Sequence, residues 1–214
     1  MLSAYFRLPL PLVLPLYLML LLAGCGNESV DTSAADSPAT APASAPYSDA
    51  FADIESRMEA DDATPAELSA ALVERFPAVS DAQTGTLDPA ASQQFIALAE
   101  RIADRAPAGD TTAALPLYRA AEVASALGNP TKAVQLYERV YADYPTFHRA
   151  PESLFMLAFT YDEYLDDLDN AKRRYEEFLE KYPENGFADD TEMLLKNLGK
   201  SDEEILRELE QSLQ

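Results

Sequence analysis

Apolar positions in this chain predict helices, because no segment shows the sustained alternation of apolar and polar residues that marks a half-buried strand. Capping signals mark several helix starts: Thr64–Glu67 and Ser201–Glu204 as capping boxes, and Asp88–Pro89 and Asn129–Pro130 as an N-cap followed by proline. Only seven glycines occur, which suits helices better than hairpins. The predicted helices are residues 48–60, 64–76, 89–105, 111–127, 130–143, 150–164, 168–181, 187–198 and 202–212.

Two of these helical segments repeat each other at a distance of 38 residues. The segment at 136–145, LYERVYADYP, corresponds to RYEEFLEKYP at 174–183. The matched positions are Ala133, Tyr137 and Pro145 with Ala171, Tyr175 and Pro183. An internal repeat of this size predicts a stacked array of helical hairpins.

The two hairpins, 111–143 and 150–181, resemble tetratricopeptide repeats. The first hairpin carries the pattern at Leu117, Ala120, Ala121, Ala124, Ala133, Tyr137, Val140 and Pro145. The second carries it at Leu154, Leu157, Ala158, Tyr161, Ala171, Tyr175, Phe178 and Pro183. Small residues let the two helices of a hairpin approach closely, aromatic residues fill the gaps between hairpins, and proline ends the unit.

The repeat departs from the usual tetratricopeptide pattern in two respects. Its period exceeds the family's 34 residues, with three extra residues between Pro145 and Leu154 and one between Tyr161 and Ala171. The first hairpin has Ala124 where an aromatic residue is usual. Upstream, Phe95, Ala99 and Ile102 suggest a helix like the second one of a hairpin. No normal first helix precedes it in the sequence.

The predicted fold is therefore all-α, a short right-handed solenoid of tetratricopeptide-like hairpins. Residues 47–110 form irregular N-terminal helices, and residues 111–214 form the repeats. Downstream, Leu194, Leu195 and Leu198 suggest one more helix of the kind that opens each hairpin. The segment from Ser201, with Ile205, Leu206 and Leu209, is expected to cap the array.

The N-terminus reads as an export signal. Leu8–Leu22 is an apolar run preceded by Arg7, too short to span a bilayer but fitting a signal-peptide core. It ends in Leu22-Ala23-Gly24-Cys25, which resembles the lipobox of bacterial lipoproteins. That resemblance implies removal of residues 1–24 and lipidation of Cys25, while an ordinary secretory signal followed by a free thiol is the alternative.

The composition of the residues after Cys25 predicts a tether. Residues 26–46 contain almost no large apolar side chains, so with Cys25 they form a flexible, lipidated linker over 25–46. In lipoproteins of several Gram-negative groups, an aspartate after the cysteine retains the protein in the inner membrane. Gly26 stands there instead, which favours the outer membrane.

The charge balance of the chain restricts the classes of partner that it can bind. The chain has 37 acidic and 16 basic residues, a balance that disfavours nucleic acid and anionic lipid surfaces. The single histidine, His148, lies in a linker and has no partner for nucleophilic catalysis. Acids crowd 162–169, but their spacing fails the calcium-loop pattern, so capping and solvation explain them better than a metal. We expect no cofactor, no small-molecule substrate and no enzymatic activity.

The expected function is protein binding. By repeat position, the inner face of the array would present Tyr118, Glu122, Phe155, Phe159 and Asp162, although apolar residues at helical spacing can equally be core. The plan is similar to that of the tetratricopeptide lipoproteins of outer-membrane barrel assembly and envelope constriction. We expect a lipid-anchored periplasmic scaffold for other envelope proteins, with a peptidoglycan-acting or glycan-binding protein as the alternative.

Overall fold

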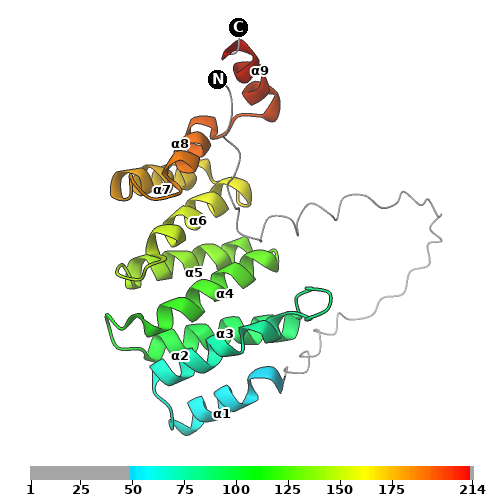
Figure 1. Ribbon diagram of the computed structural model, residues 1–214, viewed down its shortest axis with the longest axis vertical. Helices are drawn as coiled ribbons and strands as arrows, with labels where there is room; N and C mark the ends of the chain where they lie inside the picture. Colours follow the sequence, from blue (N-terminus) through cyan, green and yellow to red (C-terminus); the bar gives the residue numbers. More distant parts are fainter. Residues whose placement is uncertain (1–48, 213–214) are drawn as a thin grey trace, which may run out of the picture. The chain divides into compact units, whose positions relative to one another are not determined.

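The computed structural model of this chain describes residues 49–212, which are all-α apart from one isolated bridge between Ser80 and Leu87 (Figure 1). The predicted signal peptide over 1–24, the lipidation site Cys25 and the tether up to residue 46 lie outside the described residues. Within 49–212, no helix is both long enough and apolar enough to cross a bilayer.

The N-terminal helices begin where the capping chemistry predicts. After η2 (Asp49–Phe51) come α1 (Ala52–Ala60) and α2 (Pro65–Glu74). At the start of α2, the Glu67 N–H donates to Thr64 Oγ1 at 3.3 Å, and the Thr64 N–H donates to Glu67 Oε2 at 2.8 Å. This reciprocal pair is the predicted capping box, which satisfies two backbone donors that the first turn leaves free.

The long connection before α3 is ordered rather than open. It contains η3 (Phe76–Val79) and the Ser80–Leu87 bridge, and it turns at Gly85 with a φ of 71°. α3 (Pro89–Arg105) then starts at Asp88, whose carboxylate accepts from the Ala91 N–H at 2.9 Å. α3 packs against both α2 and α4, so α2 is the partner that the sequence did not assign to it.

The two repeats form consecutive hairpins. η4 (Thr111–Ala113) leads into α4 (Ala114–Ala126), which pairs with α5 (Pro130–Asp143). α6 (Ala150–Glu163) pairs with α7 (Leu168–Lys181) in the same way, and α5 packs on α6 between the hairpins. Asn129 caps α5 and Asp167 caps α7, each through its side-chain oxygen.

Burial inside the hairpins follows the repeat pattern. The small residues Ala121, Ala133, Ala158 and Ala171 are fully buried where the paired helices meet, and so are Leu117 and Leu157. Tyr137 and Tyr175 are 1% and 0% exposed. Tyr161 is half-buried, whereas Pro145 and Pro183 are exposed two residues beyond the ends of α5 and α7. The prolines therefore end the hairpins and do not pack within them.

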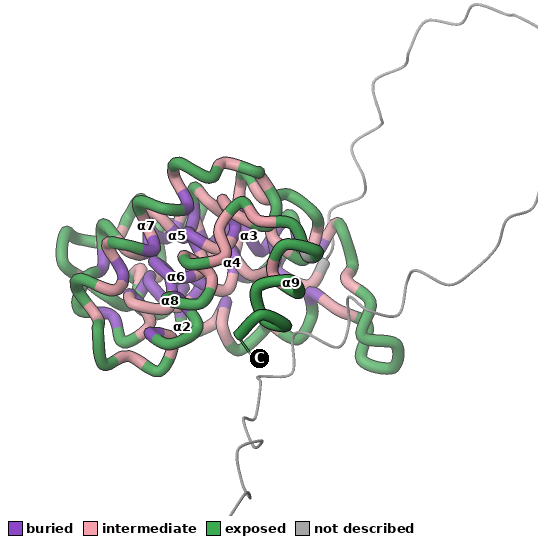
Figure 2. The backbone as a smooth tube through the Cα atoms, turned by 90° about the horizontal axis from the view of Figure 1, so that it is seen from above, coloured by how far each residue is buried: buried purple, intermediate pink, exposed green. Residues whose placement is uncertain are grey.

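One core runs through the irregular helices and the repeats together. Its buried residues extend from Phe51 to Phe178, and the purple segments of the tube in Figure 2 mark buried positions along the described helices. Phe95 on α3 contacts the Phe51 and Phe76 rings edge to face at 5.9 and 5.2 Å between centroids. Residue 110 was predicted to divide the irregular N-terminal helices from the repeats. The two parts share one core there, because α3 packs directly on α4.

The C-terminal helices differ from the cap expected of them. α8 (Ala188–Asn197) packs on α7 through Ala188 and Thr191. α9 (Asp202–Ser212) follows a turn at Gly199, whose φ is 73°. Of the three apolar residues expected in the cap, Ile205 is half-buried, but Leu206 and Leu209 are 58% and 55% exposed, so α9 buries only a small part of its apolar face. The expectation that this segment caps the solenoid is wrong in this respect.

Candidate functional site

Tyr118, expected on the open face of the first hairpin, is buried. Its side chain is 5% exposed, and the Phe147 ring lies 6.4 Å from its own between centroids. The Arg149 guanidinium covers the ring from 5.2 Å, and the phenol oxygen is 3.5 Å from a Glu152 carboxylate oxygen. Burial and the neighbouring carboxylates raise the pKa of Tyr118 to about 12, so the phenol stays neutral.

Phe155, the corresponding residue of the second hairpin, is also core. It is 9% exposed. The Phe187 ring stacks on it at 4.7 Å between centroids, and the Phe178 ring meets it edge to face at 6.0 Å. The prediction that Tyr118 and Phe155 are open groove aromatics is therefore wrong, and the alternative assignment to the core holds for both.

The extra linker residues explain this burial. A 38-residue period leaves a longer connection between hairpins than the family's 34-residue unit has. In the first connection the added length places Phe147 and Arg149 against Tyr118, and in the second it places Phe187 against Phe155. Each of these two aromatic residues is thus covered by residues of the connection that follows its hairpin.

The other three predicted groove residues stay accessible. Glu122 on α4 keeps 29% of its side chain exposed and pairs with Arg119 at 2.7 Å. Phe159 on α6 is half-buried, with its ring 6.2 Å from Phe155 and 6.1 Å from the exposed Tyr164. Asp162 accepts a hydrogen bond from the Tyr175 hydroxyl at 3.2 Å. Burial raises the pKa of Asp162.

The acidic residues at the turn between α6 and α7 have structural roles. Asp167 accepts from the Asn170 N–H at 3.1 Å and so caps α7. Asp166 takes a positive φ of 50°, a turn conformation that aspartate tolerates. No group of three metal-ligating side chains occurs in the part of the chain that the structure describes. His148 is exposed in the linker, with its ring 4.6 Å from Phe147.

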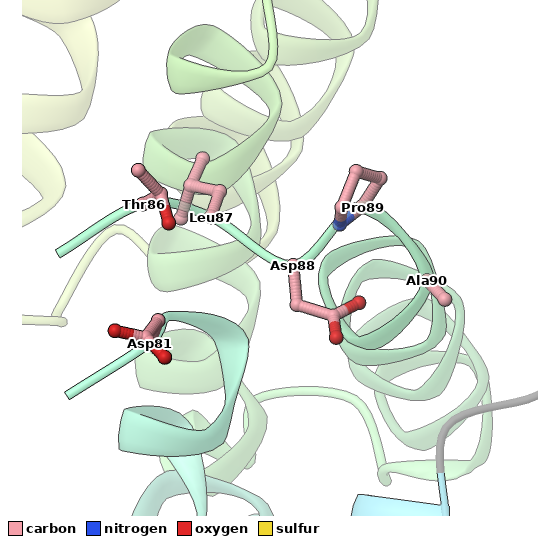
Figure 3. A pocket seen from close by; sticks show the side chains of 6 residues that line it. All are labelled: Asp81, Thr86, Leu87, Asp88, Pro89 and Ala90. Carbon is pink, nitrogen blue, oxygen red and sulfur yellow. The ribbon is translucent and has the colours of Figure 1, made fainter. Parts of the chain in front are cut away.

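The structure adds two hollows that the sequence did not reveal. One, of about 420 Å³, lies beside the Ser80–Leu87 bridge and is lined by Asp81, Thr86, Leu87, Asp88, Pro89 and Ala90 (Figure 3). Both of its carboxylates are already engaged: Asp81 accepts from the Thr84 N–H at 2.7 Å, and Asp88 caps α3. These hydrogen bonds lower the pKa of Asp81, which fits a turn-stabilising residue.

The second hollow, of about 560 Å³, lies between α3 and the start of the first hairpin's turn. It is lined by Pro89, Gln93, Ile96, Ala97, Glu100, Ala124, Leu127, Asn129 and Lys132. One departure from the repeat pattern coincides with this second hollow. Ala124 stands where the repeat pattern usually carries an aromatic residue, and the hollow lies beside it.

Exposed apolar surface gathers at the C-terminal end. Met193 on α8 is 56% exposed, and it follows Pro183 by ten residues, as Phe155 follows Pro145. Among the described residues, Met193 is therefore not covered in the way that Phe187 covers Phe155. Leu206 and Leu209 on α9, in the segment predicted to be a cap, are exposed as well.

Comparison with known proteins agrees with the hairpin architecture. A tetratricopeptide-repeat family model matches residues 117–146 and 152–185, which correspond to α4–α5 and α6–α7. No curated protein matches the chain. The described part is therefore an all-α helical-repeat solenoid, and two of its hairpins match the tetratricopeptide-repeat model. Repeats of this kind are protein-interaction scaffolds, generally without enzymatic activity.

Proposed function

We propose that this tetratricopeptide-repeat protein is a lipid-anchored scaffold that binds other proteins at a bacterial cell envelope, on the periplasmic side of the outer membrane. The two matched repeats carry the binding part of the proposal. The sequence Leu22-Ala23-Gly24-Cys25 after an apolar run carries the anchoring part. Gly26, in place of an aspartate, supports the outer rather than the inner membrane.

The proposed anchor is the Cys25 sulfur, the only thiol of the chain. A single acyl chain holds a protein only marginally, whereas two or more give stable attachment, which is what lipidated N-terminal cysteines carry. The following 21 residues, 26–46, would span on the order of 25 Å as a flexible coil, from about 5–6 Å times the square root of the residue number. The scaffold would then stand clear of the lipid headgroups.

The proposed binding surface includes Phe159 and the apolar C-terminal end. Met193 on α8 and Leu206 and Leu209 on α9 are large apolar side chains that are each more than half exposed, and we propose that they contribute apolar contacts to a partner. The chain as a whole carries a net charge of −21. A partner with basic or neutral residues around an apolar contact fits this surface best.

Replacing the proposed lipid attachment site tests the anchor. We expect Cys25→Ser to move the full chain from the membrane pellet to the soluble fraction, and from the detergent phase to the aqueous phase in partitioning. Asn27→Ser, two residues along, is the matched control and should stay with the membrane. A Cys25→Ser chain that remains in the pellet would rule out thiol-linked anchoring.

Site-specific crosslinking in cells tests the binding part. A photoreactive phenylalanine analogue at Phe159 or Met193 should yield discrete crosslinked species, which mass spectrometry can identify. The same analogue at Glu59, an exposed position on α1, is the control and should yield far less of those species. Equal yields from all three positions would show that neither predicted surface contacts a specific partner.

A further inference from the structure

The hollow between α3 and the first hairpin has an apolar floor and a polar rim. Ile96 is 8% exposed and Leu127 half-buried on the floor, beside the fully buried Ala124. On the rim, Lys132 of α5 pairs with Glu100 of α3 at 2.6 Å. The volume of about 560 Å³ lies within the range of sites that hold small ligands.

The second repeat carries an aromatic residue at the backbone position that corresponds to Ala124. The Ala124 carbonyl accepts from the backbone N–H of Asn129, the residue that caps α5, at 2.9 Å. The Tyr161 carbonyl accepts from the N–H of Asp167, which caps α7, also at 2.9 Å. Ala124 and Tyr161 are therefore equivalent in backbone role, and the first hairpin lacks the aromatic ring that the second provides.

The ion pair on the α3 side of the hollow has a counterpart in the second repeat. Glu100 on α3 and Glu138 on α5 are 38 residues apart, the period of the repeat. Each pairs with a cation from the next hairpin's second helix: Lys132 reaches Glu100 at 2.6 Å, and Arg174 reaches Glu138 at 2.6 Å. Tyr161 itself is half-buried on α6.

We propose that the hollow at Ala124 receives one aromatic side chain from a partner protein. This inference rests on the proposed protein-binding function, and it specifies one contact of that function. The floor of Ile96 and Leu127 suits a flat apolar ring, and the Lys132 ammonium at the rim is placed to interact with its face. Tyr161 is the internal template for this choice.

Titration of the full chain with a side-chain analogue tests the site without the partner. In nonionic detergent, N-acetyl-L-tyrosinamide should shift the methyl resonances of Ile96 and Leu127, with half-saturation on the order of 1 mM for so small a ligand. N-acetyl-L-leucinamide, the aliphatic counterpart, should bind several-fold more weakly. Ala97→Phe places a ring into the hollow from its exposed rim and should weaken the tyrosinamide shifts at least about tenfold.

Ala142→Phe is the matched control, because Ala142 is an exposed alanine on α5 outside the hollow. It should leave the tyrosinamide shifts unchanged, and both variants should keep the parent's melting temperature. The proposal is overturned if the two methyl groups do not shift, if the leucine analogue binds equally well, or if Ala97→Phe has no effect. None of these results bears on membrane attachment or on crosslinking from Phe159 and Met193, so the two proposals fail separately.

Discussion

At the scale of single residues, ring contacts decide which aromatic side chains stabilise the array and which remain for binding. Phe155 meets four other aromatic rings, including Phe187 stacked at 4.7 Å, and is 9% exposed. Phe159, four residues later on the same helix, contacts Phe155 and Tyr164 and is only half-buried. The two residues should therefore respond differently to the same truncation.

We expect Phe155→Ala to lower the free energy of unfolding by about 3–5 kcal/mol, because it leaves a cavity among packed rings. Phe159→Ala should cost less than about 2 kcal/mol, since part of its side chain is already exposed to water. Urea denaturation followed by circular dichroism measures both. A Phe159→Ala loss as large as that of Phe155→Ala would place Phe159 in the core and remove it from the proposed binding surface.

The buried alanines give a second prediction at this scale. Ala171 is fully buried where α6 and α7 meet, so Ala171→Leu should overpack the joint and cost about 1–3 kcal/mol. Ala142→Leu, the same change at an exposed position of α5, should alter stability by less than about 0.5 kcal/mol. Thermal melts compare the two variants. If they melt alike, the small residue at position 171 does not set the helix spacing.

At the scale of elements, a polar network links the second helices of the two repeats. Arg174 on α7 pairs with Glu138 on α5 at 2.6 Å and with Glu177 at 2.8 Å. Glu177 also accepts from the Tyr141 hydroxyl of α5 at 2.6 Å and from Lys181 at 2.8 Å, and Lys181 itself bonds the Tyr141 oxygen. Burial alone would raise the pKa of Glu177, but these hydrogen bonds lower it to about 2.

This lowered pKa sets the sign of a pH effect. A carboxyl group with a depressed folded-state pKa stabilises the fold above its unfolded pKa, and that stability is lost as pH falls towards the folded value. We expect the parent to lose stability between about pH 5 and pH 2 more steeply than Glu177→Gln does. Glu176 is the control, because its side chain is 57% exposed. The Glu176→Gln variant should lose stability with falling pH as steeply as the parent does. Identical acid melts for the parent and Glu177→Gln would contradict the assignment.

Sequence reasoning located the helices well and the accessible side chains poorly. The caps at Thr64, Asp88 and Asn129 fix helix starts through local chemistry, so a local pattern suffices to predict them. Whether Tyr118 and Phe155 are open depends on Arg149 and Phe187, residues of the connections after each hairpin. Repeat position alone cannot indicate that, because a linker's path depends on tertiary packing. The exposed faces of α8 and α9 escaped prediction for the same reason.

At the scale of the whole molecule, charge opposes compactness. The chain carries 37 acidic and 16 basic residues, so we expect repulsion among carboxylates to outweigh the attraction of its ion pairs. Many of those pairs are surface contacts, such as Lys172 with Glu176 at 3.9 Å, and contribute little each. The balance should show in the salt dependence of stability.

We expect the melting temperature to rise as sodium chloride increases from 10 to 300 mM, because screening weakens net repulsion more than it weakens the pairs. Choline chloride at equal ionic strength is the control for specific cation binding and should give the same rise. A melting temperature that falls with salt would show that the interhelical pairs, led by Arg174 with Glu138, dominate the electrostatics.

The order of packing along the stack also sets the order in which the chain opens. α4, α5 and α6 each pack on a neighbour at both sides, whereas α8 packs mainly on α7 and the large apolar side chains Leu206 and Leu209 of α9 are exposed. In a linear array, opening proceeds from an end inward, one interface at a time. Backbone amides should therefore exchange with deuterium fastest in α9, then α8, and slowest around α4 to α6. Proteases should shorten the chain from its C-terminal helices before they cut either repeat.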